Sequence, residues 1–181
     1  MKVKPLKLEG AFEITFNRIG DSRGYFMEVF SEKVFAEHGL QTKWVQENQS
    51  LSTRLHTIRG LHFQAPPFAQ AKLVRVVRGE ILDILVDLRK DSATYGHWDA
   101  VNLSEDNSTA AYIPRGFAHG FCTLTESVIV QYKIDDFYVP QSEMGIRWND
   151  SDIGIRWDIE KPLLSEKDTS LPFFKDFVSP F

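Results

Sequence analysis

Short apolar runs recur along the chain, and most are rich in β-branched or aromatic residues, as is typical of β-strands. The longest stretch, Lys72 to Leu88, contains two such runs that meet at Arg78 and Gly79. Because glycine supplies the positive φ that a tight turn requires, this stretch predicts a β-hairpin. Further strands are predicted at Gly24–Phe30, Thr57–Gln64, Thr109–Ile113, Ser127–Ile134 and Gly145–Trp148. Their spacing favours an all-β antiparallel sandwich or barrel over alternating strands and helices.

Only one segment has a clear helical signature: Ser31 is a suitable N-cap, and Gly39 is a suitable terminator. The chain after Lys161 contains three prolines, so we expect it to wrap the surface in short helical or irregular pieces. The chain contains no internal sequence repeat, so a solenoid of stacked repeats is not supported. We therefore expect residues 1–181 to form a single domain with a surface tail that starts at about residue 161.

Composition narrows the class of protein. The 181 residues are 43% hydrophobic and 25% charged, as in ordinary globular proteins, and the net charge of −4 gives no general reason to expect a nucleic-acid or anionic-membrane partner. The single cysteine, Cys122, excludes an internal disulfide and a zinc site of cysteine pairs. The start lacks the apolar run of a signal peptide, and no stretch approaches the roughly 20 apolar residues of a membrane span. We therefore expect a cytoplasmic protein.

The densest polar cluster is the segment from Arg59 to Gln64, which ends a predicted strand. Strand alternation places His62 and Gln64 on one face, where a barrel would have its lumen. Lys72 and Tyr132 each end an apolar row of a later strand. A lysine or tyrosine at such a position is either a rim residue with its polar end in water or a functional group directed into a pocket.

A second cluster, from Ile113 to Phe121, contains His119 between Gly116 and Gly120. Glycines this close indicate tight backbone geometry, so we expect His119 at a strand entrance beside a cavity. The alternative is a buried histidine that hydrogen-bonds a carbonyl or a carboxylate. The remaining histidines lie in polar contexts and are expected to be solvated.

Together, the two clusters resemble the two halves of the cupin signature, with Pro114, Gly116 and His119 at positions of the second half. This resemblance implies a cupin-type jelly roll with a few short helices. Metal-binding cupins use three histidines and a glutamate, but here Gln64 stands at the second histidine position and Lys72 where the acidic ligand is expected. An ammonium group has no lone pair for a metal and repels a dication. We therefore expect neither a metal nor another cofactor.

A narrower resemblance, spread over nearly the whole chain, is to the dTDP-4-dehydrorhamnose 3,5-epimerase family. Seven segments carry it in the family's order: Asp21–Phe30, Gln46–Ser50, Arg59–Arg75, Val86–Gly96, Ile113–Phe121, Gly145–Asp150 and Leu164–Asp168. Ala93 and Ser151 stand where the family commonly has proline, in loops distant in sequence from the catalytic motifs. The resemblance implies an isomerase that acts on a dTDP-linked 4-keto-6-deoxyhexose in dTDP-rhamnose and polysaccharide biosynthesis.

Four residues match the family's proton-transfer machinery. His62 matches the base that removes a proton next to the C4 ketone, and Asp168 matches the carboxylate that pairs with it. Lys72 matches the cation near the C4 oxygen, where negative charge develops, and Tyr132 matches the acid on the other face of the sugar.

The same resemblance implies the substrate-binding residues and the assembly. Arg23 and Arg59 would neutralise the diphosphate, and the stretch from Arg23 to Glu28 would reach across from the partner subunit of a homodimer. Phe26, Glu28, Gln46 and Asn48 would contact the nucleoside. Further substrate contacts are implied for His119, Tyr138, Glu143 and Lys167, for which the alternative is a surface ion pair or a core aromatic.

Other functions stay open at this stage. A relative on the same scaffold could invert only C3 or only C5, or could be a 3,4-ketoisomerase, because the number of inversions depends on how the sugar lies in the pocket. A non-catalytic sugar-binding cupin would have no use for a base, an acid and a cation together. A metal-dependent cupin oxygenase would require the metal ligands that this sequence lacks.

Overall fold

The computed structural model describes residues 1–181 and consists mainly of β-strands, with two short α-helices. The strands are β1 (Lys2–Pro5), β2 (Phe12–Thr15), β3 (Arg18–Asp21), β4 (Gly24–Met27), β5 (Gln46–Ser52), β6 (Ile58–Gln64), β7 (Lys72–Arg78), β8 (Glu80–Asp87), β9 (Trp98–Ser104), β10 (Thr109–Ile113), β11 (Phe117–Thr123), β12 (Val128–Ile134) and β13 (Glu143–Gly145). The helices are α1 (Glu32–Glu37) and α2 (Glu166–Thr169), with 3-10 turns η1 (Pro140–Ser142) and η2 (Phe174–Asp176). No helix is long and apolar enough to cross a membrane.

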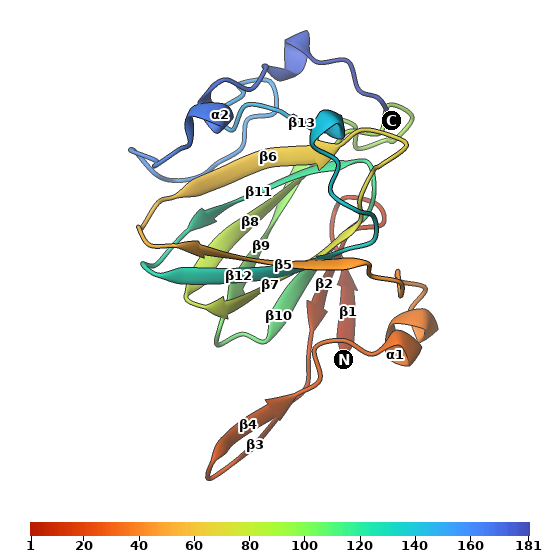
Figure 1. The fold of residues 1–181 in the computed structure, drawn as a ribbon, viewed down its shortest axis with the longest axis vertical. Coiled ribbons are helices and arrows are strands. Elements are labelled where there is room, and N and C mark those ends of the chain that lie inside the picture. Colours follow the sequence, from red (N-terminus) through yellow and green to blue (C-terminus); the bar gives the residue numbers. More distant parts are fainter.

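Two antiparallel sheets face each other across the core (Figure 1). The six-stranded sheet has the order β1-β2-β10-β7-β12-β5, and the five-stranded sheet has the order β13-β6-β11-β8-β9. Between them lies a core of inward-facing aliphatic and aromatic side chains, among them Val74, Val76, Ile81 and Leu85. The predicted all-β antiparallel class is confirmed, although the two sheets are not hydrogen-bonded into a closed barrel.

The predicted hairpin at Gly79 is wrong. β7 pairs with β10 and β12, whereas β8 pairs with β9 and β11, so the chain passes from one sheet to the other at this turn. Gly79 has the expected positive φ of +80°, and a Cβ there would lie 2.6 Å from Thr125 Oγ1. Both apolar runs contribute to the same inner core, so they face each other across it instead of pairing edge to edge.

Other predicted elements agree more closely with the structure. β10 has the predicted bounds, and β6 and β12 each begin one residue later than predicted. Helix α1 follows the predicted N-cap Ser31 and ends before Gly39. The strand predicted at Gly145–Trp148 is not formed, because β13 ends at Gly145 and Ile146 and Trp148 pack against the outer face of the sheet.

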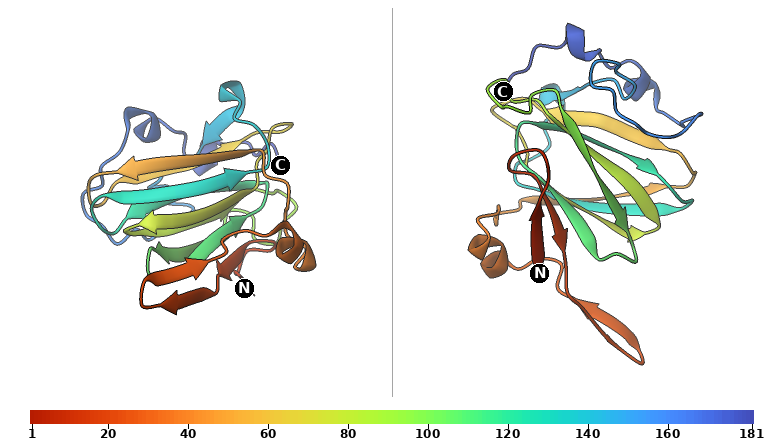
Figure 2. Two further views of the ribbon diagram at one scale, coloured as in Figure 1. Left: turned by 60° about the horizontal axis from the view of Figure 1, so that its bottom comes forward. Right: turned by 180° about the vertical axis from the view of Figure 1, so that it is seen from behind.

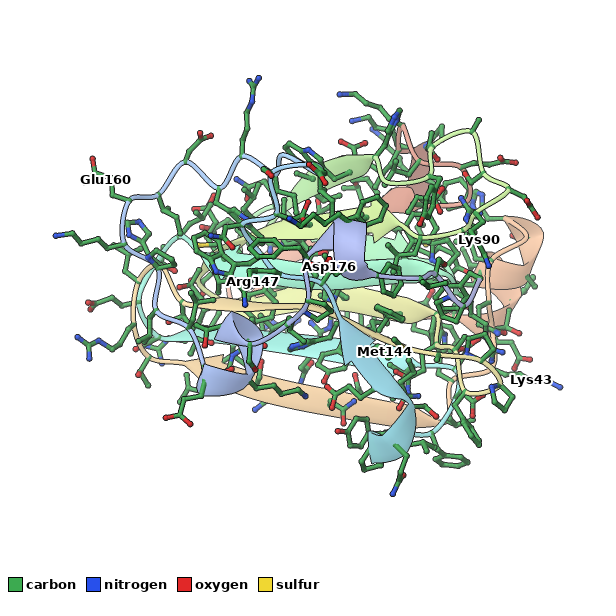
Figure 3. The ribbon with its side chains drawn as sticks, turned by 90° about the horizontal axis from the view of Figure 1, so that it is seen from above. Lys43, Lys90, Met144, Arg147, Glu160 and Asp176 are labelled. Carbon is green, nitrogen blue, oxygen red and sulfur yellow. The ribbon has the colours of Figure 1, made fainter.

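The C-terminal segment covers the outer face of the five-stranded sheet. Its apolar residues, including Ile146, Trp157 and Phe177, pack on outward-facing residues of β6 such as Leu61 and Phe63. Figure 3 looks down onto this covering layer. It contains α2 and η2, as expected for a tail of short helical pieces.

A two-stranded hairpin, β3–β4, projects away from the body of the molecule (Figures 1 and 2). It exposes large apolar side chains, with Ile19 and Phe26 each 67% exposed. The outer face of the six-stranded sheet near its base is covered by α1, whose Phe35 is fully buried.

Candidate active site

A cavity with two lobes lies between the sheets. The first lobe has a volume of about 590 Å³ and the second about 330 Å³, and His62, Lys72 and Tyr132 line both. His62 comes from β6 of the five-stranded sheet, whereas Lys72 on β7 and Tyr132 on β12 come from the six-stranded sheet. His62 therefore lies on the wall opposite Tyr132, and the inward alternation predicted for all three side chains is observed.

His62 forms a hydrogen-bonded pair with Asp168. Its Nε2 lies 2.6 Å from Asp168 Oδ1, although 106 residues separate the two in sequence. Asp168 lies in α2, where its backbone N–H donates to the side chain of the N-cap Ser165 at 3.1 Å. Burial disfavours the charged carboxylate, but hydrogen bonds from His62, Ser165 and the Gly60 backbone outweigh it and lower the pKa of Asp168. An ionised Asp168 fixes the orientation of the His62 ring.

Lys72 places an ammonium group in this cavity with few direct partners. Its Nζ donates a long hydrogen bond, 3.4 Å, to the backbone carbonyl of His62. Burial lowers the pKa of Lys72 to about 8, and the charges of Asp83 and Glu143 oppose this shift. Lys72 is therefore mostly charged at neutral pH and can attract a developing oxyanion.

A second histidine and carboxylate pair lies beside the cavity: His119 lines the first lobe, and Asp83 is fully buried behind it. His119 Nε2 is 2.7 Å from Asp83 Oδ1, while Asp83 Oδ2 is buried without a hydrogen-bond partner. Burial lowers the pKa of His119, and the nearby Lys72 and His62 add to this shift while Asp83 opposes it. Both interpretations of His119 from the sequence therefore hold, since it is carboxylate-bound and it lines the first lobe.

β6 and β11 approach closely beside these two pairs. Gly60 has φ of +128°, and a Cβ at this position would lie 2.5 Å from the Cα of Gly120 and 2.8 Å from the carbonyl oxygen of His119. Side chains at either glycine would push the strands apart. The tight backbone predicted around His119 thus brings it next to His62, with which it is paired in the strand register.

Tyr132 supplies a weakly acidic hydroxyl on the wall opposite His62. Burial raises the pKa of Tyr132, and the negative charge of Glu143 adds to the effect, while Arg59 opposes it. The phenol therefore keeps its proton at neutral pH and can donate it.

The implied substrate-binding residues of the body surround this centre. Arg59, His119 and Lys167 line the first lobe, and Arg59 donates to Ser52 Oγ at 3.0 Å and to the Leu51 carbonyl at 3.1 Å. The second lobe is lined by Gln46, Asn48, Tyr138 and Glu143. Tyr138 Oη and Lys167 Nζ both lie 2.6 Å from Glu143 Oε2, so this carboxylate connects the two lobes. These bonds outweigh the effect of burial and lower the pKa of Glu143.

The structure of one chain does not bring Arg23, Phe26 and Glu28 to the cavity. They lie on or just after the projecting hairpin, where Arg23 donates to Asp21 Oδ2 at 2.6 Å and is largely exposed. Phe26 and Glu28 line a separate groove beside α1.

Asp83 is the one buried charge of the site that sequence reasoning missed. It lies within the apolar strand β8, on the same face as the inward Ile81 and Leu85. A single carboxylate in an inward apolar row requires a polar partner, and this was the available signal. Its partner, His119, could only be assigned once the pairing of β8 with β11 was known.

The donor set does not fit a divalent cation. No group of three or more His, Cys, Asp or Glu side chains is arranged to hold a metal ion. Each cavity histidine already bonds a carboxylate, and the side-chain amide of Gln64 bonds backbone groups. The ammonium of Lys72 would in addition repel a dication. What the arrangement can do is remove a proton from a carbon acid, hold the resulting oxyanion and return a proton from the other side.

Comparison with known proteins agrees with this chemistry. The family described as dTDP-4-dehydrorhamnose 3,5-epimerase matches residues 5–176. An enzyme of that name from Methanothermobacter thermautotrophicus is 51% identical over 164 residues, which cover 89% of this chain and 88% of the relative.

Solved structures extend the likeness to the fold. The dTDP-4-dehydrorhamnose 3,5-epimerase of Bacillus anthracis, with TDP and PPi bound, is 44% identical with a TM-score of 0.94 and is matched over 96% of this chain and 99% of that one. The dTDP-6-deoxy-D-glucose-3,5-epimerase of Legionella pneumophila, in complex with dTDP-4-keto-L-rhamnose, is 37% identical with a TM-score of 0.92 over 96% and 93% of the two chains.

Proposed function

The chain belongs to the dTDP-4-dehydrorhamnose 3,5-epimerase family and is an isomerase with a cupin-type jelly roll, and from this premise we propose how its cavity works. It converts dTDP-4-dehydro-6-deoxy-D-glucose into dTDP-4-dehydro-L-rhamnose by inverting C3 and C5. Both carbons are adjacent to the C4 ketone, so each inversion proceeds by loss of a proton to an enolate and return of a proton to the opposite face.

The observation that carries this proposal is the pairing of His62 with Asp168 on one wall of a cavity whose other wall holds Tyr132 and Lys72. His62 takes the proton, and the ionised Asp168 stabilises the imidazolium that forms. Lys72 stabilises the enolate oxygen at C4. Tyr132 returns a proton from the other side of the sugar ring. The product is an epimer of the substrate, because the proton returns to the opposite face of the ring. These steps use no metal and no redox cofactor.

The lobes accommodate the two parts of a nucleotide sugar. The guanidinium of Arg59 keeps free donors after bonding the β5 backbone and Ser52, and these suit diphosphate oxygens. Gln46, Asn48, His119, Tyr138, Glu143 and Lys167 supply further polar contacts. In a homodimer, the projecting hairpin of one subunit would bring Arg23, Phe26 and Glu28 to the cavity of the other.

The number of inversions is tested by proton NMR of dTDP-4-dehydro-6-deoxy-D-glucose with the enzyme in deuterated water. We expect deuterium at both C3 and C5 together with the L-rhamno product. Deuterium at only one carbon would instead indicate a C3-only or C5-only epimerase. No incorporation at C3 or C5 would contradict epimerisation and would favour a ketoisomerase, which would label C4 instead, or a non-catalytic sugar-binding protein.

A further inference from the structure

Gln64 lines the second lobe, yet its amide is directed at backbone groups of the cavity wall. It is the last residue of β6 and only 3% exposed. Its Nε2 donates to the carbonyls of Phe68 at 2.7 Å and Phe137 at 3.1 Å, and its Oε1 accepts from the Val139 N–H at 2.6 Å. Both polar atoms of the amide are therefore occupied by the protein itself.

The wall segment that Gln64 holds, residues 136–139, belongs to no helix or strand. Two other glutamines of the same lobe also bond it. Gln70 Nε2 donates to the Asp136 carbonyl at 2.9 Å, and the Tyr138 N–H donates to Gln46 Oε1 at 3.4 Å. Side-chain amides thus replace the ladder hydrogen bonds that this segment lacks, and Gln64 provides the shortest of them.

Tyr138 lies between Phe137 and Val139, the two residues of this segment whose backbone Gln64 bonds. Its ring lines the second lobe, and its hydroxyl donates to Glu143 Oε2 at 2.6 Å. That is the one hydrogen bond of its side chain, and the residue is 49% exposed. Its place at the cavity therefore depends on the backbone on either side, at Phe137 and Val139, and Gln64 fixes both.

We propose that Gln64 is the positioning residue for Tyr138, and that through its grip on Phe137 and Val139 it shapes the substrate-binding wall of the second lobe. This inference rests on the proposed function for the identity of the substrate. Gln64 acts on binding and not on the proton transfers, because neither His62 nor Lys72 bonds its side chain. Gln64, which stands where metal-binding cupins have a histidine ligand, thus holds the backbone of the cavity wall in place.

The test is steady-state kinetics of Gln64→Leu, which removes all three hydrogen bonds at similar volume. We expect KM to rise about tenfold or more while kcat changes by less than about threefold, the pattern of lost ground-state binding. The matched control is Gln141→Leu, the same change at an exposed glutamine of the same connection, which should leave both constants unchanged. Gln64→Glu keeps an acceptor for the Val139 N–H but places a carboxylate against the carbonyls of Phe68 and Phe137. It should show the same rise in KM, and it replaces Gln64→Leu as the test if that variant does not fold.

A double variant separates positioning from general destabilisation. If Gln64 acts through Tyr138, adding Gln64→Leu to Tyr138→Ala should raise KM by less than about twofold over Tyr138→Ala alone. The Val139 amide proton should exchange faster with solvent in Gln64→Leu than in the wild type, as measured by NMR. The inference would be overturned if the effects of the two substitutions on KM multiplied in the double variant. It would also be overturned if Gln64→Leu left KM unchanged or left the exchange of the Val139 amide proton unchanged. A failure of the proposed function is distinct, because it would show in the wild type as absence of deuterium incorporation, while the exchange measurement would still decide the role of Gln64.

Discussion

Lys72 is the residue at which burial and charge oppose each other most directly. The cavity removes its ammonium from water, which lowers its pKa to about 8, while Asp83 and Glu143 favour the charged form. The other titratable groups that line the first lobe around it are Arg59, His62, His119, Tyr132, Lys167 and Asp168. Because only the charged form stabilises an enolate, the reaction depends on a balance that a single carboxylate can alter.

This balance predicts the alkaline limb of the pH profile. Lys72 loses its charge as the pH rises through its pKa, so kcat/KM should fall above about pH 8. Asp83→Asn removes a charge that favours the ammonium, so this limb should move to lower pH. Asp106→Asn, an exposed loop residue, is the control and should leave the profile in place. An unchanged limb in Asp83→Asn would show that Asp83 does not act on Lys72.

At the scale of elements, α2 shows how the C-terminal segment contributes to the site. The helix comprises only Glu166–Thr169, and it cannot be stable alone. It is held from outside by Arg147, whose guanidinium donates to the Thr169 carbonyl at 2.7 Å and to the Leu171 carbonyl at 3.0 Å (Figure 3). The position of Asp168 therefore depends on a residue that is distant in sequence, near the start of the covering layer.

We predict that Arg147→Ala lowers both stability and activity. Loss of two charged hydrogen bonds to backbone carbonyls should reduce the free energy of unfolding by about 1–3 kcal/mol in chemical denaturation. kcat should fall several-fold, because Asp168 would no longer be held against His62. Arg156→Ala changes an exposed arginine of the same segment and should do neither. Equal effects of the two substitutions would exclude a specific role for Arg147.

The elements also show what the sequence could predict. Strand β10, helix α1 and the inward direction of His62, Lys72 and Tyr132 follow from local periodicity and caps, which residues close in sequence determine. The placement of β7 and β8 in different sheets does not, because two apolar runs joined by a glycine can either pair or face each other across a core. The contact of Asp168 with His62 was available only from the family resemblance, since no local pattern joins residues 106 positions apart.

At the scale of the whole molecule, the projecting hairpin β3–β4 is the feature that a single chain leaves unexplained. It exposes Phe26 and carries Arg23 at its turn, and neither residue lines the cavity of its own chain. Exposed aromatic side chains on an extended arm are typical of a surface that another chain covers. We expect light scattering to show a dimer, and a fully active monomer would contradict the proposed exchange of hairpins.

Mixing two inactive variants tests whether Arg23 acts in the partner's site. Arg23→Ala lacks the phosphate contact, and His62→Ala lacks the base. In a mixed dimer, the site that retains His62 receives the intact hairpin from the other chain. If equal amounts are unfolded and refolded together, about a quarter of all sites should be complete, as random pairing of symmetric dimers requires. Absence of recovered activity, with mixed dimers present, would place Arg23 in the site of its own chain or outside the site.

The central claim is that base and acid act from opposite walls, and Tyr132→Phe in deuterated water tests it most directly. Without the phenolic proton, His62 and Lys72 should still form the enolate and return deuterium to the original face. We therefore expect the variant to incorporate solvent deuterium while inverting the sugar poorly, as followed by proton NMR. In His62→Ala both exchange and inversion should fall to roughly 10⁻² to 10⁻⁴ of the wild-type rate. If Tyr132→Phe lost exchange as completely as His62→Ala while still binding the substrate, the assignment of base and acid to opposite walls would be wrong.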